Sequence, residues 1–227
     1  MAKIKTAYYC QKCGTQYPQW HGQCKNCGEW NTLVEEIVEK KSSHYDILGS
    51  GKQKIINITE VETGTEIRLK TVSEELNRVL GGGIVLGSVI LIGGEPGIGK
   101  STLLLQLALK MKKKILYVSG EESASQIKMR ADRITDIQNP NCFLYTETSI
   151  EKILMEAKNL QPDLMIVDSI QTLQSQLLES AAGTVSQIRE CSGELIKFAK
   201  EKNIPVILVG HITKDGQIAG PKVLEHM

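Results

Sequence analysis

Residues 94 to 101 have the residue types and spacing of a phosphate-binding loop. The segment fits the pattern GxxxxGK(S/T), and its residues are Gly94, Glu95, Pro96, Gly97, Ile98, Gly99, Lys100 and Ser101. Glycines allow the backbone to turn tightly and to direct successive N–H groups at phosphate oxygens, and the N-terminus of a following helix attracts the same negative charge. The segment therefore predicts a site for the phosphates of a nucleoside triphosphate, and we expect ATP.

Three side chains at the end of this loop have expected roles at the nucleotide. Lys100 can reach the β- and γ-phosphates, the Ser101 hydroxyl can ligate Mg²⁺, and Thr102 can hydrogen-bond the α-phosphate. The alternative is a chance match in a glycine-rich loop. An apolar run at residues 89–92 and a helical pattern after residue 100 favour the phosphate loop, because its mechanism requires a strand before it and a helix after it.

Carboxylates follow two of the apolar runs. Residues 164–167 lead to Asp168, which is thus expected at the carboxyl end of a strand, where parallel sheets bind ligands. Asp168 is the candidate to hold Mg²⁺ through water. Residues 115–118 lead to Glu121 and Glu122, and one of these can activate the attacking water; the alternative is that both only favour the N-terminus of the next helix. The residues alone leave the choice between the two open.

His211 follows the apolar run at residues 205–209. A histidine at the end of that strand could contact the γ-phosphate and transmit its presence to the next loop. A single histidine is more often a structural residue, and the residues alone favour that interpretation.

Four of the six cysteines form two CxxC pairs near the start of the chain. The ligand set is Cys10, Cys13, Cys24 and Cys27, and a glycine follows each pair. Each pair can turn both thiolates toward one ion, and four thiolates in tetrahedral geometry favour a closed structural Zn²⁺ site. A segment this short cannot bury much core, so the metal would supply its folding energy. A redox CxxC pair or an iron centre is the alternative.

Composition sets broad limits on the class of protein. Apolar residues make up 41% of 227 residues, which suits a buried core, and the formal net charge is +1, so no overall basic field indicates a nucleic-acid partner. The sequence shows no signal-peptide core and no apolar run long enough to span a membrane. We therefore expect a cytoplasmic protein with no membrane partner.

The chain divides into three regions. Residues 1–38 are the four-cysteine module, residues 39–54 form a linker rich in charge and serine, and residues 55–227 alternate apolar runs with helical patterns. Strands are expected near 89–92, 115–118, 142–144, 164–167 and 205–209, and helices after the loop and near 123–131, 149–159 and 183–201. Thr71 and Glu74 have capping-box spacing before a short helix. The pattern predicts an α/β fold with a mostly parallel central sheet.

The same motifs, in this order, resemble those of the bacterial RadA (Sms) family of DNA repair and recombination proteins. They are YYCQKCG, QWHGQCKNCGEW, LNRVLGGGIVLGSVILIGGEPGIGKSTLLLQ, YVSGEES, LMIVDSIQT and VILVGHITKDGQIAGPKVLEHM. The resemblance implies a zinc finger before a RecA-like P-loop ATPase core. It also implies a DNA-stimulated ATPase that works on recombination intermediates by branch migration or in a helicase-like way.

The resemblance also assigns roles to residues. It implies that Glu121 is the catalytic glutamate and that His211 is the polar sensor after the last core strand. It implies that the segments from Ser169 to about Gly183 and from Lys214 to Pro221 face DNA. The implied partners are single-stranded or branched DNA, a recombinase, and further copies of the chain, which form a hexameric ring in full-length members.

This sequence departs from the family pattern at its end. Members continue into a KNRFG motif and a Lon-like C-terminal domain, whereas this sequence ends at Met227, so we expect slow turnover and weak stimulation by DNA. Two rival functions share the core features. One is a RecA-like regulatory or clock-type ATPase, and the other is a zinc-dependent binding module whose nucleotide site is regulatory.

Overall fold

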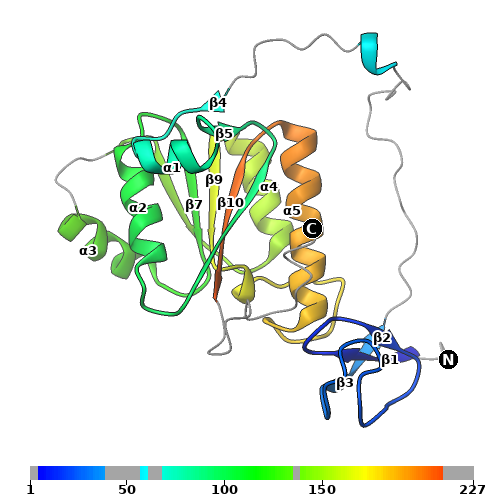
Figure 1. Cartoon of the computed structure of the whole chain (residues 1–227). Coiled ribbons are helices and arrows are strands. Elements are labelled where there is room, and N and C mark those ends of the chain that lie inside the picture. Colours follow the sequence, from blue (N-terminus) through cyan, green and yellow to red (C-terminus); the bar gives the residue numbers. More distant parts are fainter. Residues whose placement is uncertain (1–4, 39–56, 61–67, 135–138, 212–227) are drawn as a thin grey trace.

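The computed structural model describes residues 5–38, 57–60, 68–134 and 139–211. The expected linker at 39–54 and the expected DNA-facing segment from Lys214 to Pro221 lie outside these residues. The described residues form a small antiparallel sheet near the N-terminus and a larger parallel sheet with helices on both faces (Figure 1).

The N-terminal sheet has three strands. They are β1 (Lys5–Cys10), β2 (Gln16–Tyr17) and β3 (Leu33–Val38), in the order β2-β1-β3 with antiparallel pairing. The buried apolar cluster of this module consists of Cys10, Cys24 and Leu33. Both tryptophans of the module, Trp20 and Trp30, are more than half exposed. A core this small offsets little of the entropy of ordering the chain.

The central sheet has five parallel strands in the order β6-β10-β9-β7-β8. Their bounds are β6 (Val89–Gly94), β7 (Ile115–Ser119), β8 (Cys142–Thr146), β9 (Leu164–Asp168) and β10 (Val206–His211). All five strands fall where apolar runs predict them. The three inner strands are almost fully buried, because helices cover both faces of a parallel sheet.

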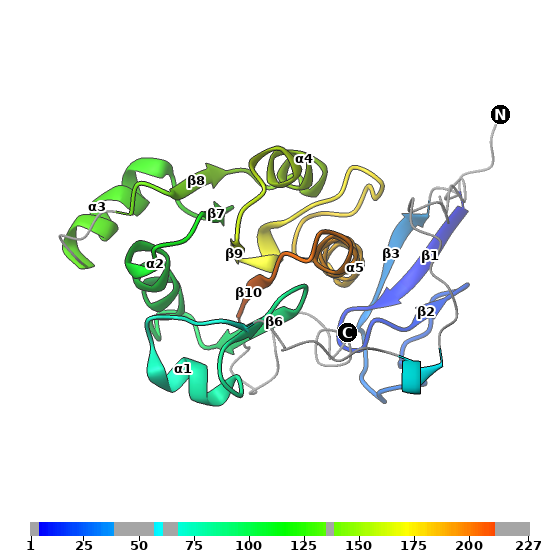
Figure 2. The same ribbon diagram turned by 90° about the horizontal axis from the view of Figure 1, so that it is seen from above.

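Four helices cover the two faces of this sheet (Figures 1 and 2). They are α2 (Lys100–Lys110) and α3 (Ala124–Ile134) on one face and α4 (Ile150–Leu160) and α5 (Val185–Lys202) on the other. Side chains alternate between the faces along each strand. On β7, Tyr117 therefore belongs to the apolar cluster beneath α2 and α3, whereas Val118 belongs to the cluster beneath α4 and α5. The expected α/β fold with a parallel sheet is confirmed.

Short elements complete the described part of the domain. They are the 3₁₀ turns η1 (Ile58–Glu60) and η2 (Ile170–Thr172), the helix α1 (Glu74–Val79), and the pair β4 (Arg68–Leu69) and β5 (Ile84–Val85). The expected cap of α1 at Thr71 is wrong. The N-cap is Ser73, whose hydroxyl accepts a hydrogen bond from the Leu76 N–H, while the Thr71 hydroxyl donates to the Ser73 carbonyl.

Candidate nucleotide and metal sites

The phosphate-binding loop connects the end of β6 to the start of α2. Gly97 and Gly99 adopt positive φ angles of 80° and 101°, a region where side chains with a Cβ are strained. Gly99 is the N-cap of α2, and no acidic residue lies in the first turn of that helix. The free N–H groups of the first turn and the positive end of the helix dipole therefore face the loop without competition from a carboxylate.

The Lys100 side chain folds back onto the backbone of the phosphate-binding loop. The residue is buried, and its Nζ donates hydrogen bonds to the carbonyl oxygens of Gly94 at 2.7 Å and Glu95 at 2.8 Å. These two carbonyls compensate the ammonium charge when no phosphate is near. The same ammonium is within reach of an anion that enters the loop.

Strand register brings the other candidate residues to the same edge of the sheet. His211, at the end of β10, pairs with Gly94 on β6, and Asp168, at the end of β9, pairs with Ser119 on β7. Ser119 in turn pairs with Thr146 on β8. Parallel strands end together, so the loop, the aspartate and the SGEES turn meet along one line at the carboxyl edge.

Asp168 is buried at this edge and has one oxygen bonded and one free. Its Oδ2 accepts a hydrogen bond of 2.8 Å from the Tyr117 hydroxyl, and its Oδ1 has no hydrogen-bond partner among the described residues. The Tyr117 hydroxyl also lies 3.5 Å from the Ser101 carbonyl oxygen, which places Asp168 beside the first turn of α2. Burial and the neighbouring Asp168 carboxylate raise the pKa of Tyr117, so its hydroxyl remains a donor.

Glu121 lies where three strands end together. The Ser169 hydroxyl donates to its Oε1 at 2.7 Å, and His211 Nε2 lies 3.0 Å from the same oxygen. Burial would raise the pKa of Glu121, but the bonds from Ser169 and His211 outweigh it and hold this pKa below its ordinary value. The side chain is 42% exposed, so a carboxylate that is ionised at neutral pH remains open to water.

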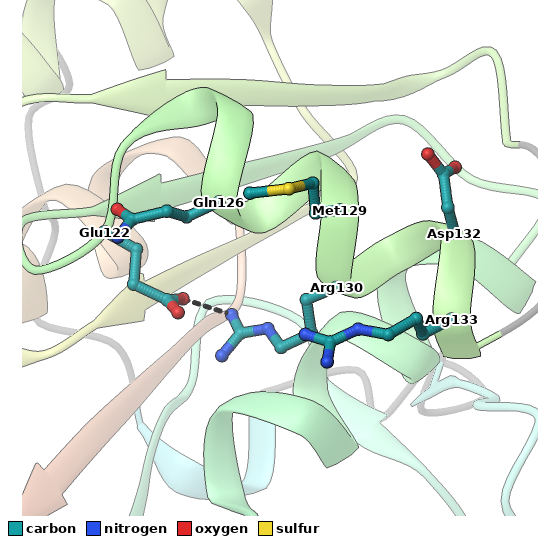
Figure 3. A pocket seen from close by; sticks show the side chains of 6 residues that line it. All are labelled: Glu122, Gln126, Met129, Arg130, Asp132 and Arg133. Carbon is teal, nitrogen blue, oxygen red and sulfur yellow. Dashed lines mark ion pairs between the residues drawn. The ribbon is translucent and has the colours of Figure 1, made fainter.

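Glu122 points to a different place. Its Oε2 lies 2.7 Å from Arg130 Nη2, and Figure 3 shows the carboxylate directed at the Arg130 side chain on α3. The contact is an ion pair without hydrogen-bond geometry, since Arg130 Nε and Nη2 have no hydrogen-bond partner among the described residues. The two adjacent glutamates, which the residues alone do not separate, thus have different surroundings, and only Glu121 faces Ser169 and His211.

Sequence reasoning did not single out Ser169 or Tyr117. The first lies in the segment expected to face DNA, and the second appears only as part of an apolar strand. The partner of each residue lies far away in the chain. Only the motif LMIVDS, which places a serine directly after the metal-binding candidate, could have drawn attention to Ser169.

The segment from Ser169 to Gly183 is only partly at the surface. Ser169 and Ile170 are buried, and the exposed residues are Gln174 and several of those from Gln176 onward. Gln187, which is buried on α5, holds the loop: its amide donates to the carbonyls of Ser175, Leu178 and Ser180 and accepts from the Ser175 N–H. Contact with DNA remains a prediction, and it can involve only the outer part of this segment.

The four cysteines form one cluster. All four Sγ atoms lie within 4.8 Å of one another, with 3.6 Å between Cys10 and Cys27 and 3.5 Å between Cys13 and Cys24. A tetrahedral site with metal–sulfur bonds of about 2.3 Å has sulfur–sulfur edges of about 3.8 Å, so these distances suit one metal ion. None of the four is in a disulfide.

The two CxxC turns have the same backbone geometry. The N–H groups of Gly14 and Gly28 donate to the carbonyls of Cys10 and Cys24 at 2.8 Å each, and both glycines have φ near +70°. Hydroxyl groups surround the sulfurs: Thr32 contacts Cys10, Thr15 contacts Cys13 and Tyr17 contacts Cys24. Hydroxyl donors favour the thiolate form that a metal requires and fix the directions of the ligands.

Two family models match this chain. The AAA domain model matches residues 58–217, and a model described as a rubredoxin metal-binding domain matches residues 8–35. The second range contains all four clustered cysteines. None of the helices in the described part of the chain is long and apolar enough to span a lipid bilayer.

Curated relatives are similar over the whole chain. DNA repair protein RadA of Bacillus subtilis is 50% identical over 234 residues, that of Aquifex aeolicus is 50% identical over 229, and that of Listeria monocytogenes is 47% identical over 233. Each match covers 100% of this chain and 51% of the relative. The chain therefore spans about half the length of the curated relatives it matches. The expected resemblance to the bacterial RadA family is confirmed.

Among solved structures, a DnaB-like replicative helicase described with its interactions with primase has a similar fold. It superposes with a TM-score of 0.55 and 18% sequence identity, and the match covers 67% of this chain and 45% of the helicase chain. At this identity the likeness concerns the fold alone, which agrees with the expected RecA-like core.

Proposed function

Because this chain belongs to the AAA domain family and has bacterial DNA repair RadA proteins as relatives, we propose that it is a DNA-stimulated ATPase. We propose that it acts on recombination intermediates. The observation that supports the ATPase most directly is the meeting of Lys100, Asp168 and Glu121 at one edge of the sheet. Branch migration or helicase-like work is the activity we propose for it on DNA.

In the proposed reaction the loop from Gly94 to Thr102 binds ATP. Lys100 exchanges the carbonyls of Gly94 and Glu95 for oxygens of the β- and γ-phosphates, while Ser101 and the free oxygen of Asp168 would hold Mg²⁺. When bound, Mg²⁺ neutralises charge on the phosphate oxygens.

Glu121 then orients a water molecule and takes its proton as the water oxygen bonds to the γ-phosphorus. The bond from phosphorus to the β–γ bridging oxygen breaks, and ADP and phosphate leave. Ser169 and His211 both hold Oε1 of Glu121, so Oε2 is the oxygen we assign to the water. His211 is 25% exposed beside this carboxylate and can respond to the γ-phosphate, which is the sensor role we propose for it.

We propose that the four-cysteine cluster holds Zn²⁺. Thiolates in a closed tetrahedral set favour zinc in a structural role. Because the core of the module is small, binding of the metal would stabilise its fold. An iron centre has the same ligand set, and metal analysis distinguishes the two.

A Cys24→Ser variant is expected to lose this metal. Elemental analysis of the wild-type protein should find about one zinc per chain, and the variant should contain none, because three thiolates bind a structural zinc far less tightly than four. A Cys142→Ser variant, which changes a cysteine outside the cluster, should keep its zinc. A metal-free native protein with fully reactive thiols would contradict the assignment, and iron in place of zinc would correct it.

The DNA-dependent part of the proposal is tested by the rate of phosphate release. Single-stranded or branched DNA should raise the steady-state rate of ATP hydrolysis measurably, although the rate itself is expected to be slow and the stimulation weak. The Lys100→Ala variant should show no rate above background with either kind of DNA. Measurable hydrolysis that DNA does not change would favour a regulatory or clock-type ATPase. Tight ATP binding with negligible turnover would favour a zinc-dependent binding module.

We propose a cytoplasmic location and, as further partners, other copies of the chain and a recombinase.

A further inference from the structure

Tyr117 is a side chain with a polar hydroxyl whose ring lies in an apolar core. It lies on β7 and is 1% exposed, and its ring packs in the cluster beneath α2 and α3 with residues such as Leu104, Ile127 and Ile166. A ring enclosed in this way has little freedom of rotation. Its hydroxyl is therefore held at one position, directly below the first turn of α2.

That position is next to the carboxylate of Asp168. The hydroxyl donates to Oδ2 at 2.8 Å, while Oδ1 of the same carboxylate is buried and has no hydrogen-bond partner among the described residues. The hydroxyl also lies 3.5 Å from the carbonyl oxygen of Ser101. One core side chain thus touches both residues that would hold Mg²⁺.

We propose that Tyr117 is a positioning residue for magnesium: it engages one oxygen of Asp168, so that the other is presented to the metal beside Ser101. The inference rests on the proposed ATPase function, because it concerns how that site holds its metal. A carboxylate on a strand end can rotate about its last side-chain bond. A fixed hydrogen bond to one oxygen selects one orientation in advance, and removal of partners of this kind commonly changes metal affinity by about 10- to 100-fold.

The charges near Tyr117 do not offer a substitute for this bond. Glu122 and Arg130 lie close enough to affect the hydroxyl electrostatically, but they form an ion pair with each other. Among the described residues, no other side chain is hydrogen-bonded to Asp168. Removal of the hydroxyl should therefore leave a buried carboxylate with no internal partner.

The test compares metal dependence in the wild-type protein and in Tyr117→Phe. The probe is a fluorescent, non-hydrolysable ATP analogue, titrated with Mg²⁺ and separately without any divalent ion. Phenylalanine keeps the ring and removes one oxygen atom. We expect the Mg²⁺ concentration at half-maximal enhancement of binding to rise about tenfold, while metal-free binding changes little. The melting temperature should fall, because a buried carboxylate loses its hydrogen-bond donor, so binding is compared well below the transition. Tyr145→Phe, the same change on the neighbouring strand β8, should behave as wild type.

A second pair of variants tests whether the effect passes through Asp168. In the Asp168→Asn background, Tyr117→Phe should cause no further change in Mg²⁺ dependence, because the carboxylate it positions is gone. A further change of similar size would overturn the inference, because the hydroxyl would then act through its contact with the Ser101 carbonyl and not through Asp168. An unchanged Mg²⁺ dependence in Tyr117→Phe itself would also overturn it. If the wild-type protein shows no Mg²⁺-dependent binding of the analogue, the proposed function fails first and this inference fails with it.

Discussion

A Glu121→Gln variant is expected to bind ATP about as well as the wild-type protein and to hydrolyse it about 10²- to 10⁴-fold more slowly. Glutamine has nearly the same shape, and its amide oxygen can still accept the hydrogen bond from Ser169. It cannot accept a proton from the attacking water. The phosphate loop and Lys100, which provide most of the contact with the nucleotide, are unchanged.

The measurement is a pair of assays on the same preparation. Equilibrium binding of ATP shows whether the site is intact, and a single-turnover assay measures the chemical step apart from product release. The pKa of Glu121 is held below its ordinary value, so the wild-type carboxylate is ionised at neutral pH and the comparison needs no correction for protonation.

The adjacent glutamate supplies a matched control. Glu122→Gln makes the same chemical change one residue away and removes an ion pair with Arg130 on α3, so its hydrolysis rate should stay close to that of the wild type. If Glu122→Gln stops hydrolysis and Glu121→Gln does not, the assignment of the base is wrong. Equal loss in both variants would indicate that the whole turn, and not one carboxylate, sets the rate.

A Lys100→Ala variant is expected to fail at an earlier step. The ammonium would pair with the β- and γ-phosphates, and loss of one member of a buried, hydrogen-bonded charge pair costs about 2 to 5 kcal/mol. Affinity for ATP should therefore fall between about 30-fold and several thousand-fold, and hydrolysis should fall to background. The expected pattern is thus opposite to that of Glu121→Gln, in which binding is retained.

Isothermal calorimetry or a fluorescent ATP analogue can measure this loss, with Lys110→Ala as the control. Lys110 ends the same helix that Lys100 begins, so its removal changes the same net charge at the far end of α2. The melting temperature should differ little from that of the wild type, since within the described part of the chain the Lys100 ammonium bonds to two carbonyls of the loop and to no other group. Unchanged ATP affinity in Lys100→Ala would exclude the loop as the nucleotide site.

Features encoded by neighbouring residues are determined by the sequence alone. The glycines and lysine of the phosphate loop act within eight consecutive positions, and each CxxC pair forms its turn within four. The five strands of the central sheet are visible as apolar runs because parallel strands are buried on both faces. By contrast, the strands of the N-terminal module have no such signal, since they belong to a module with almost no core.

The assembly of the site is decided only by the tertiary structure. Glu121 meets Ser169 and His211 across 48 and 90 residues of sequence, and Tyr117 meets Asp168 across 51. The strand order β6-β10-β9-β7-β8 places these strand ends side by side, and the order of strands cannot be deduced from the apolar runs themselves. The distinction between Glu121 and Glu122 has the same origin. Two adjacent carboxylates have the same local chemistry, and they differ here because the turn directs one toward β9 and β10 and the other toward Arg130 on α3.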